Sequence, residues 1–225
     1  MAVQNNSGMW GVPSGCAAWV PAGLRHAIEP TPAARARTLY IYTSRPLSRL
    51  RSGPPSRGRF GGSCAVLQLS PLLRAVVDHI HQRDAHADTH LVAVLLDQLA
   101  AQRELPLFLP RLSSARAQQV AGVLSSDPAD TPRIHHIASE LGVSGRTIER
   151  AFVADAGLSL GEWRQRARIL RAVALLAGGM DVKDVALEVG YETPAAFVVA
   201  FSKYAGMTPG RVKPGRPSAR LSLRD

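Results

Sequence analysis

Two segments in the C-terminal part of this chain repeat the same pattern of residues. The pattern Ile134-x-x-Ile137-Ala138-x-x-Leu141-Gly142 returns as Val182-x-x-Val185-Ala186-x-x-Val189-Gly190, at a separation of 48 residues. Further along, the separation becomes 49, where Ile148, Phe152 and Ala156-Gly157-Leu158 match Phe197, Phe201 and Ala205-Gly206-Met207. One residue has therefore been added in the turn of the second copy. Each copy has the pattern of a short helix, a glycine-containing turn and a second helix. This pattern predicts two units that each bind a groove of DNA, rather than one catalytic pocket.

Three positions of each copy meet the packing demands of a helix-turn-helix. The unit needs a small residue where its helices cross, a residue tolerant of positive φ in the turn, and an apolar residue that pins the second helix. The first copy supplies Ala138, Gly142 and Ile148, and the second supplies Ala186, Gly190 and Phe197. A hairpin in an ordinary helical bundle can imitate one copy, but two copies make the pattern specific.

The second helix of each copy must also present a free face. At about 100° per residue, Ile148 and Phe152 point inward, which leaves the outer face to Arg146, Thr147 and Arg150. Arginine suits guanine or phosphate, and Glu149 on the shoulder suits a cytosine amino group or an arginine. A solvated charged face is the alternative interpretation. Contact between this face and DNA is favoured because the second helix of a helix-turn-helix is the one that enters the major groove.

The corresponding face of the second copy is mostly apolar. It can touch thymine methyl groups but cannot make bidentate base contacts, so the first copy is expected to carry most sequence specificity. The expected DNA-contacting residues of the first copy, including the helix cap Ser144, are Ser144, Arg146, Thr147, Glu149 and Arg150. Those of the second copy are Thr193, Ala195, Ala196, Val199 and Lys203, with Ser202 on the same face.

Composition agrees with a nucleic-acid partner but does not locate it. The 225 residues carry 27 Lys and Arg against 17 Asp and Glu, a formal charge of +10, which favours a polyanion. The charge is shared evenly, with 14 cations against 9 anions from residue 131 onward and 13 against 8 before it. Cys16 and Cys64 are too few for a disulfide framework. With no signal peptide or membrane span in the sequence, a cytoplasmic protein without a membrane partner is expected.

The remainder of the chain divides by composition. Residues 1–44 look like β-structure, with short apolar stretches at 9–12, 17–20 and 38–42, and residues 45–62 read as an Arg/Pro/Gly linker. Residues 63–112 hold a strand-like run at 64–69 and connector helices at about 71–82 and 89–103. The apolar face of the second connector helix, Leu91, Val94, Leu95 and Leu99, fits internal packing and a dimer seam equally well. Residues 113–213 are helical, with the two units at about 134–155 and 182–205, and 214–225 form a basic tail.

The helical region resembles a known family. Its first helix-turn-helix unit contains the motif Ile137-Ala138-x-x-Leu141-Gly142-Val143-Ser144-x-Arg146-Thr147-Ile148-x-Arg150-x-Phe152. The rest of the pattern follows it in the chain: Trp163-Arg164, Arg168, Val185-Ala186, Gly190-Tyr191, Phe197-x-x-x-Phe201 and Gly206-Met207-Thr208-Pro209. This region, about 115–213, resembles the DNA-binding domain of AraC/XylS-type transcription regulators. The resemblance implies that the long middle helix, 160–178, holds both recognition helices in successive major grooves, about 34 Å apart. Val199 and Val212 depart from the residues common in that family.

The N-terminal part resembles a piece of a second family. Gly15-x5-Pro21-Ala22-Gly23-x-x-His26 is similar to the second cupin motif, but the first motif, which supplies most metal ligands, is absent. About forty residues cannot close a barrel of six or more strands, so a truncated or mis-started cupin-like segment is expected. His26 alone is a poor metal site. The clustered His79, His81, His86 and His90 are expected to lie on polar helix faces.

The sequence therefore predicts a mainly α fold: two helix-turn-helix subdomains joined by a long helix, preceded by a partial β segment and connector helices. The expected function is a sequence-specific DNA-binding transcription regulator, with no catalytic residue, no metal and no cofactor. Double-stranded promoter DNA is the expected partner, RNA polymerase and a second copy are further candidates, and the small-molecule effector is open. A metal-dependent cupin enzyme and a non-specific architectural DNA-binding protein are the alternatives.

Overall fold

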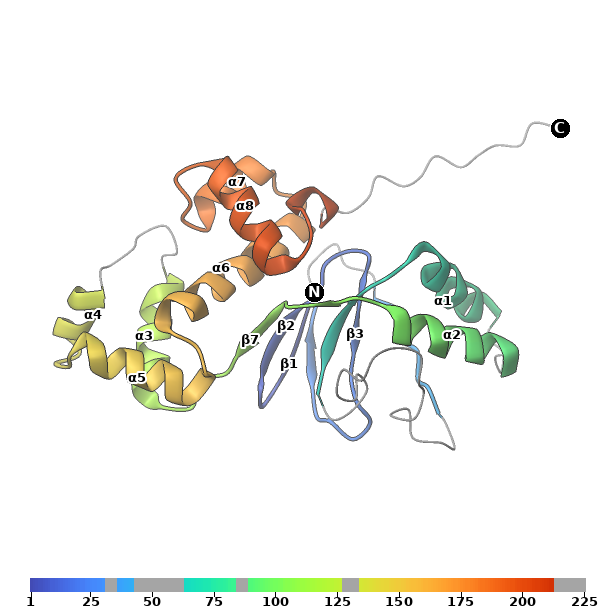
Figure 1. Ribbon diagram of the computed structural model, residues 1–225, viewed down its shortest axis with the longest axis horizontal. Coiled ribbons are helices and arrows are strands. Elements are labelled where there is room, and N and C mark those ends of the chain that lie inside the picture. Colours follow the sequence, from blue (N-terminus) through green and yellow to red (C-terminus); the bar gives the residue numbers. More distant parts are fainter. Residues whose placement is uncertain (31–35, 43–62, 84–88, 127–133, 213–225) are drawn as a thin grey trace.

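Short antiparallel strands build the N-terminal part of the molecule, and helices build the rest (Figure 1). The structure is a computed structural model that describes residues 1–30, 36–42, 63–83, 89–126 and 134–212. The predicted linker, 45–62, and the predicted tail, 214–225, lie outside the described residues. The mainly α fold with an N-terminal antiparallel sheet is as predicted from the sequence.

The first sheet is organised around a hairpin. Strands β1 (Ala2–Asn5) and β2 (Gly8–Gly11) pair antiparallel, and the Asn5 side-chain oxygen accepts a hydrogen bond of 2.7 Å from the Ser7 amide in the turn. Strand β4 (Ala27–Glu29) pairs with β1, and β7 (Phe108–Pro110) pairs with β2. The sheet order is therefore β4-β1-β2-β7.

The second sheet has the order β3-β5-β6. Strand β5 (Ala65–Gln68) lies between β3 (Cys16–Trp19) and the short β6 (Glu104–Leu105), and both pairings are antiparallel. Cys64, Ala65, Val66 and Leu67 are buried because β5 is covered on both faces.

The strand predictions were partly wrong. Strands at 9–12, 17–20 and 64–69 appear as β2, β3 and β5 with small shifts, but the residues at 38–42 form no strand. Strands β1, β4, β6 and β7 were not predicted, and β6 and β7 lie in the region assigned to connector helices. Strands of two to four residues are too short to show an alternating pattern, and distant pairing partners specify them.

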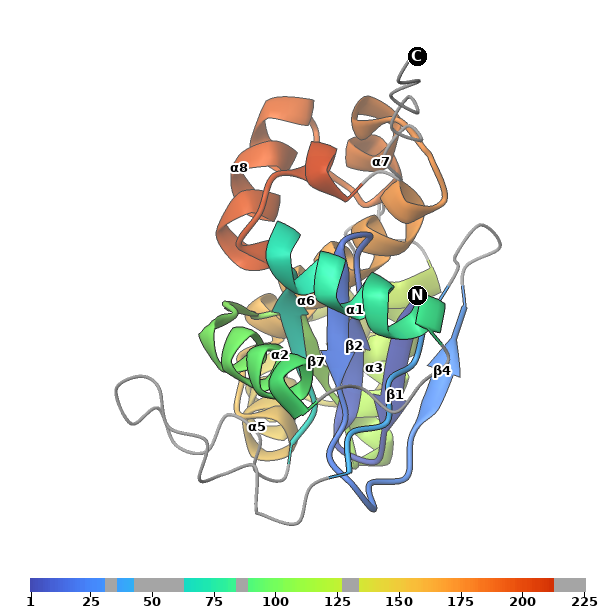
Figure 2. The ribbon, with the colours of Figure 1, turned by 90° about the vertical axis from the view of Figure 1, so that its right-hand side faces the viewer.

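Two helices follow β5 and pack against it. Helices α1 (Pro71–Arg83) and α2 (Thr89–Ala101) lie where the sequence predicts them, and α1 lies in front of the strands in Figure 2. Leu73, Leu95 and Leu99 pack with Ala65 and Leu67 in one core cluster. The predicted apolar face of α2 is therefore split, because Leu95 and Leu99 are buried whereas Val94 is 42% exposed.

The first helix-turn-helix unit has its own core. Helices α3 (Ala115–Ser126), α4 (Ile134–Glu140) and α5 (Gly145–Ala156) pack around Ile137, Ile148 and Phe152. Asp155, near the end of α5, caps the start of α3. Its carboxylate accepts hydrogen bonds of 2.8–3.0 Å from the amides and hydroxyls of Ser113 and Ser114.

Helix α6 (Leu160–Ala177) runs from the first unit towards the second (Figure 1). It begins at a capping box, in which Ser159 and Glu162 satisfy each other's backbone amides, and ends at Gly178 and Gly179. Ala174 is exposed. The buried residues are Leu160, Trp163, Ile169, Leu170, Ala172, Val173 and Leu176. Different faces are buried along the helix because α6 meets the first unit near its start and the sheet and second unit further on.

The N-terminal sheets, α6 and the second unit share one core. Val3, Trp10 and Val66 belong to the same buried cluster as Val173 and Phe197. The Trp163 indole donates a hydrogen bond of 3.1 Å to the Pro110 carbonyl and fixes α6 to β7. A Cβ on Gly11 would lie 3.3 Å from the Leu170 Cγ, so glycine lets β2 approach α6 closely. Among the described helices, none is long and apolar enough to cross a membrane.

We expect Asp155→Asn to destabilise the first unit by about 1 kcal/mol, because it weakens the cap of α3. The hydrogen bonds from Ser114 and Ser113 hold the pKa of Asp155 below its ordinary value near 3.8. The carboxylate's contribution is therefore complete above that value and is lost as the pH falls through the lower folded-state pKa. Thermal melts at pH 7 and pH 3 check this, with Asp97→Asn on α2 as the control. An equal loss of stability in both variants at pH 7 would refute the assignment.

Candidate DNA-binding interface

The second unit repeats the first in its helices. Helix α7 (Val182–Glu188) and helix α8 (Pro194–Ala205) correspond to α4 and α5, and a short 3-10 turn, η2 (Pro209–Arg211), follows. The small residues predicted at the helix crossings, Ala138 and Ala186, are 4% and 0% exposed. The predicted pinning residues, Ile148 and Phe197, are fully buried. Both packing predictions are confirmed.

The two turns have the same backbone hydrogen bonds. In the first unit the Gly142 and Val143 amides donate to the Ser139 and Ala138 carbonyls, at 3.1 and 2.9 Å. In the second unit, 48 residues on, the Gly190 and Tyr191 amides donate to the Leu187 and Ala186 carbonyls, both at 2.9 Å. Gly142 and Gly190 have φ values of 61° and 80°, as predicted for these turn positions.

The residue added in the second turn can now be located. Ser144 caps α5, its hydroxyl accepting from the Thr147 amide at 3.2 Å. Thr193 caps α8 in the same way, accepting from the Ala196 amide at 3.2 Å. The caps are 49 residues apart, whereas the preceding turn bonds are 48 apart, so the added residue is Glu192.

The outer face of α5 carries the predicted cations. Arg146 and Arg150 are exposed, whereas Thr147 is half-buried. The Thr147 hydroxyl lies 2.9 Å from the Ser144 hydroxyl and belongs to the cap of the helix. Within the described part of the chain, neither arginine has an ion-pair partner, so both guanidinium groups are available to a polyanion.

Glu149 has a contact that the sequence did not predict. Its carboxylate accepts a hydrogen bond of 3.1 Å from the Leu160 amide, the first amide of α6. It therefore ties the recognition helix of the first unit to the connecting helix. From the sequence, Glu149 was expected at the edge of the outer face of α5. Its partner, Leu160, lies beyond the turn that follows α5.

The outer face of α8 is apolar, as the sequence predicts. Ala195, Ala196 and Lys203 are exposed, and Val199 is 71% exposed, a high fraction for a large aliphatic side chain. Phe197 and Phe201 are fully buried on the opposite face. Ser202 is half-buried rather than outward.

Polar contacts fix the second unit to α6. Arg171 and Glu188 form an ion pair of 2.6 Å, and the Arg168 guanidinium lies 5.8 Å from the centre of the Tyr191 ring. Gln165 donates to the Tyr191 hydroxyl. Sequence reasoning missed these contacts, although the one-turn spacing of Gln165, Arg168 and Arg171 along one helix face was a signal for them.

The structure gives no chemical role to Ser159 or to the histidine that the sequence analysis considered as a metal ligand. Ser159 is the cap of α6. His26 is exposed, and its Nδ1 lies 3.0 Å from the Leu24 carbonyl oxygen. Over residues 1–30, 36–42, 63–83, 89–126 and 134–212, no three His, Cys, Asp or Glu side chains are placed to hold a metal ion. His86, one of the four clustered histidines, lies outside the described residues.

Comparisons with known proteins agree with this geometry. Residues 137–214 match a family model described as a helix-turn-helix domain. The HTH-type transcriptional regulator NimR of Escherichia coli K12 is 29% identical over 208 residues, covering 90% of this chain and 72% of NimR. The HTH-type transcriptional regulator RipA of Corynebacterium glutamicum is 37% identical over 111 residues, covering 49% of this chain and 32% of RipA.

A solved structure of a probable AraC family transcriptional regulator from Rhodopseudomonas palustris is similar over 45% of this chain and all of that one. Its sequence identity is 25% and its TM-score 0.40. The relatives are transcription regulators, and the matched domain covers both helix-turn-helix units. The chain is therefore a helix-turn-helix DNA-binding protein that is similar to transcription regulators.

Proposed function

We propose that this regulator binds its operator with α5 and α8 in successive major grooves on one face of the duplex. One observation carries the proposal: two units with matching turn hydrogen bonds are attached to the same continuous helix. Each recognition helix has a buried face towards its unit and an exposed face away from it. A second helix-turn-helix unit that is rigidly connected to the first lengthens the DNA site that is recognised, without adding a flexible linker between the units.

The two helix-turn-helix units are proposed to contribute differently to DNA recognition. Arg146 and Arg150 on α5 can make bidentate bonds to guanine or contact phosphate, so the first unit carries most of the base specificity. Ala195, Ala196 and Val199 on α8 can contact thymine methyl groups and let the backbone approach the DNA. The helix caps Ser144 and Thr193 lie at the N-termini of α5 and α8, where free first-turn amides would face the backbone phosphates; Pro194, the first residue of α8, has no amide to donate. Lys203 adds a phosphate contact.

Glu149 is proposed as a positioning residue rather than a base-reading one. Its carboxylate already accepts from the Leu160 amide, and this bond sets the angle between α5 and α6. An α5 helix without this bond would present Arg146 and Arg150 at a less defined angle.

The regulator is proposed to act in the cytoplasm, by binding rather than catalysis. A homodimer through the α1–α2 helix pair stays a proposal: of the predicted seam, Leu95 and Leu99 are buried within the chain and Val94 is exposed. RNA polymerase is the further proposed partner. The domain boundaries follow the sequence proposal, with 113–213 as the DNA-binding domain.

Selection of bound fragments from random DNA tests the function. We expect one enriched site containing two segments about one helical turn apart, bound at least about 1,000-fold more tightly than bulk DNA. The architectural alternative predicts strong salt dependence with no preference among fragments. That result would overturn sequence-specific binding, and turnover with a bound metal would favour the cupin-enzyme alternative.

We expect Arg150→Ala to reduce discrimination at one base pair of the selected site by about 1–3 kcal/mol. Fluorescence anisotropy with the selected site and its single-base variants measures this. Val199→Ala, the equivalent position in the second unit, is the matched control and should change discrimination less. If Arg150→Ala binds like wild type while Val199→Asp abolishes recognition, the order of the two units is reversed.

We expect Glu149→Ala to lower the free energy of unfolding by about 1 kcal/mol, because the first amide of α6 loses its acceptor. Glu149→Gln retains an oxygen acceptor and should preserve most of that stability and the base preference of the wild type. Chemical denaturation and site selection provide the two measurements. A stable Glu149→Gln protein with a changed base preference would assign Glu149 to base reading instead.

A further inference from the structure

A cleft of about 460 Å³ lies where the second sheet and the α1–α2 helix pair meet the end of the second helix-turn-helix unit. Residues of β3 and β5 form one side, and the start of α1 and the residues after α2 form another. Met207 and Arg211, from the second unit, complete the wall. The volume lies within the range of small-molecule sites in proteins, about 300–1,000 Å³. Among the described residues, none of α5, α6 or α8 lines this cleft.

Three arginines from different parts of the chain line this space, which we call the arginine cleft. Arg74 lies on α1, Arg103 follows α2, and Arg211 lies in η2. All three are exposed, so a ligand can reach them from solvent. Over the part of the chain that the structure describes, no Asp or Glu lines the cleft, and none of these guanidinium groups forms an ion pair. An anion in the cleft would offset the repulsion between these like charges.

The acidic groups closest to these arginines in the sequence do not supply that negative charge. Asp78, one turn beyond Arg74 on α1, pairs with Arg37. Glu104, which follows Arg103, lies on β6 and does not line the cleft. The Cys16 thiol does line it, but burial raises the pKa of this thiol to about 11, even though the charge of Arg74 acts to lower it. The thiol is therefore neutral at pH 7.

Close contacts with the backbone hold two of the guanidinium groups in place. A Cβ on Gly15 would lie 2.7 Å from a guanidinium nitrogen of Arg74, so glycine lets that group lie against the main chain. Arg103 donates a hydrogen bond of 3.4 Å to the Gly206 carbonyl, which ties the end of α2 to the end of α8. Guanidinium groups that are already positioned lose less conformational entropy when they bind a ligand.

The start of α1 and the end of α2 form a fixed junction beneath these arginines. The Gln102 side chain is buried, and its oxygen accepts a hydrogen bond of 2.9 Å from the Ser70 amide. The same amide group donates 2.6 Å to the Gln98 carbonyl. Because Pro71 and Arg74 at the start of α1 line the cleft, the positive end of the helix dipole adds to its charge.

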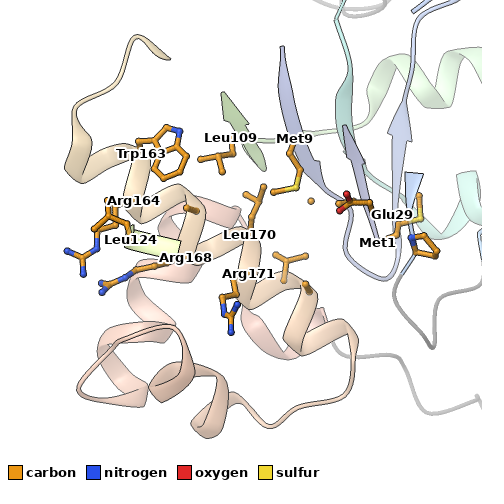
Figure 3. A pocket seen from close by; sticks show the side chains of 16 residues that line it. Met1, Met9, Glu29, Leu109, Leu124, Trp163, Arg164, Arg168, Leu170 and Arg171 are labelled. Carbon is orange, nitrogen blue, oxygen red and sulfur yellow. The ribbon is translucent and has the colours of Figure 1, made fainter. Parts of the chain in front are cut away.

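The arginines of a different cavity, between the first sheet and α6, have partners (Figure 3). Arg171 pairs with Glu188 at 2.6 Å, and the Arg168 guanidinium lies 5.8 Å from the centre of the Tyr191 ring. Arg164 also has an interaction partner. The arginine cleft differs because no carboxylate of the described residues pairs with its cations.

We propose that the arginine cleft binds the phosphate group of a small phosphate ester. A phosphate monoester carries a charge of about −1.5 to −2 at pH 7 and three acceptor oxygens, so it can engage several arginines at once. Leu69 and Met207 on the wall offer an apolar surface to the organic part of the ester. The phosphate would contact Arg74 and Arg103 from the N-terminal part and Arg211 from the second unit, so its binding stabilises the contact between these two parts.

Calorimetric titration of the full chain without DNA, at constant ionic strength, tests the binding. The probes are glucose 6-phosphate, AMP and phenyl phosphate, each paired with its phosphate-free parent: glucose, adenosine and phenol. We expect at least one ester to bind, and its parent to bind at least about tenfold more weakly, because charge-assisted hydrogen bonds are lost. Inorganic phosphate should compete with that ester. If no ester binds more tightly than its parent, the proposal is wrong.

Variants locate the site. Arg74→Gln and Arg211→Gln should each weaken binding of the ester at least about tenfold. Arg116→Gln, at an exposed arginine of α3 outside the cleft, is the matched control and should leave the affinity unchanged. Circular dichroism confirms that each variant is folded. Equal effects of Arg74→Gln and Arg116→Gln would move the phosphate to a general cationic surface and overturn the assignment.

Two further measurements separate this site from DNA binding. Saturating ester should raise the melting temperature of the wild-type chain and leave that of Arg74→Gln unchanged. The affinity for the selected DNA site is measured for the same variants. If Arg74→Gln and Arg211→Gln weaken DNA binding while no ester binds the wild type, these arginines contact the DNA backbone and the proposal is overturned. Binding of an ester by a chain that has no DNA preference would support the cleft assignment and remove the proposed function.

Discussion

Helix α6 has to satisfy two cores at once, and the arrangement of the molecule follows from that demand. Leu160 and Trp163 close the core of the first unit. Ile169, Val173 and Leu176 lie in the core shared by the sheets and the second unit. The 18 residues form a single helix, so burying its two ends fixes both units relative to each other. Packing, rather than helix propensity, stabilises a segment of this kind.

The helical part could be predicted because its signals are local. Caps such as Ser144 and Ser159, the turn glycines and the spacing of buried residues all lie within a few positions of the elements that they define. The β part could not be predicted to the same extent. Strands β6 and β7 are only two and three residues long, and partners far along the chain specify them. The partial β segment in the N-terminal residues was predicted, but the strands that residues 104–110 add to the two sheets were not.

The candidate interface was predictable wherever orientation follows from helical periodicity. Arg146, Arg150, Val199 and Lys203 are exposed, as the 3.6-residue repeat implies. Contacts between elements were not predictable. The acceptor role of Glu149 depends on where α6 begins in space, and the arginine cleft depends on segments from the second sheet, the α1–α2 helix pair and the second unit. Such features need the fold before they can be identified.

The continuity of α6 also restricts how the chain can change in evolution. Each residue of an α-helix advances about 1.5 Å and rotates about 100°, so these 18 residues span about 27 Å. One residue inserted between Ser159 and Gly178 would swing α8 more than a quarter-turn around the axis relative to α5. Substitutions on the exposed face of α6 are tolerable, whereas insertions and deletions within α6 would misalign the two helix-turn-helix units. In the proposed complex with DNA, the length of this helix sets the distance between the two segments that α5 and α8 contact.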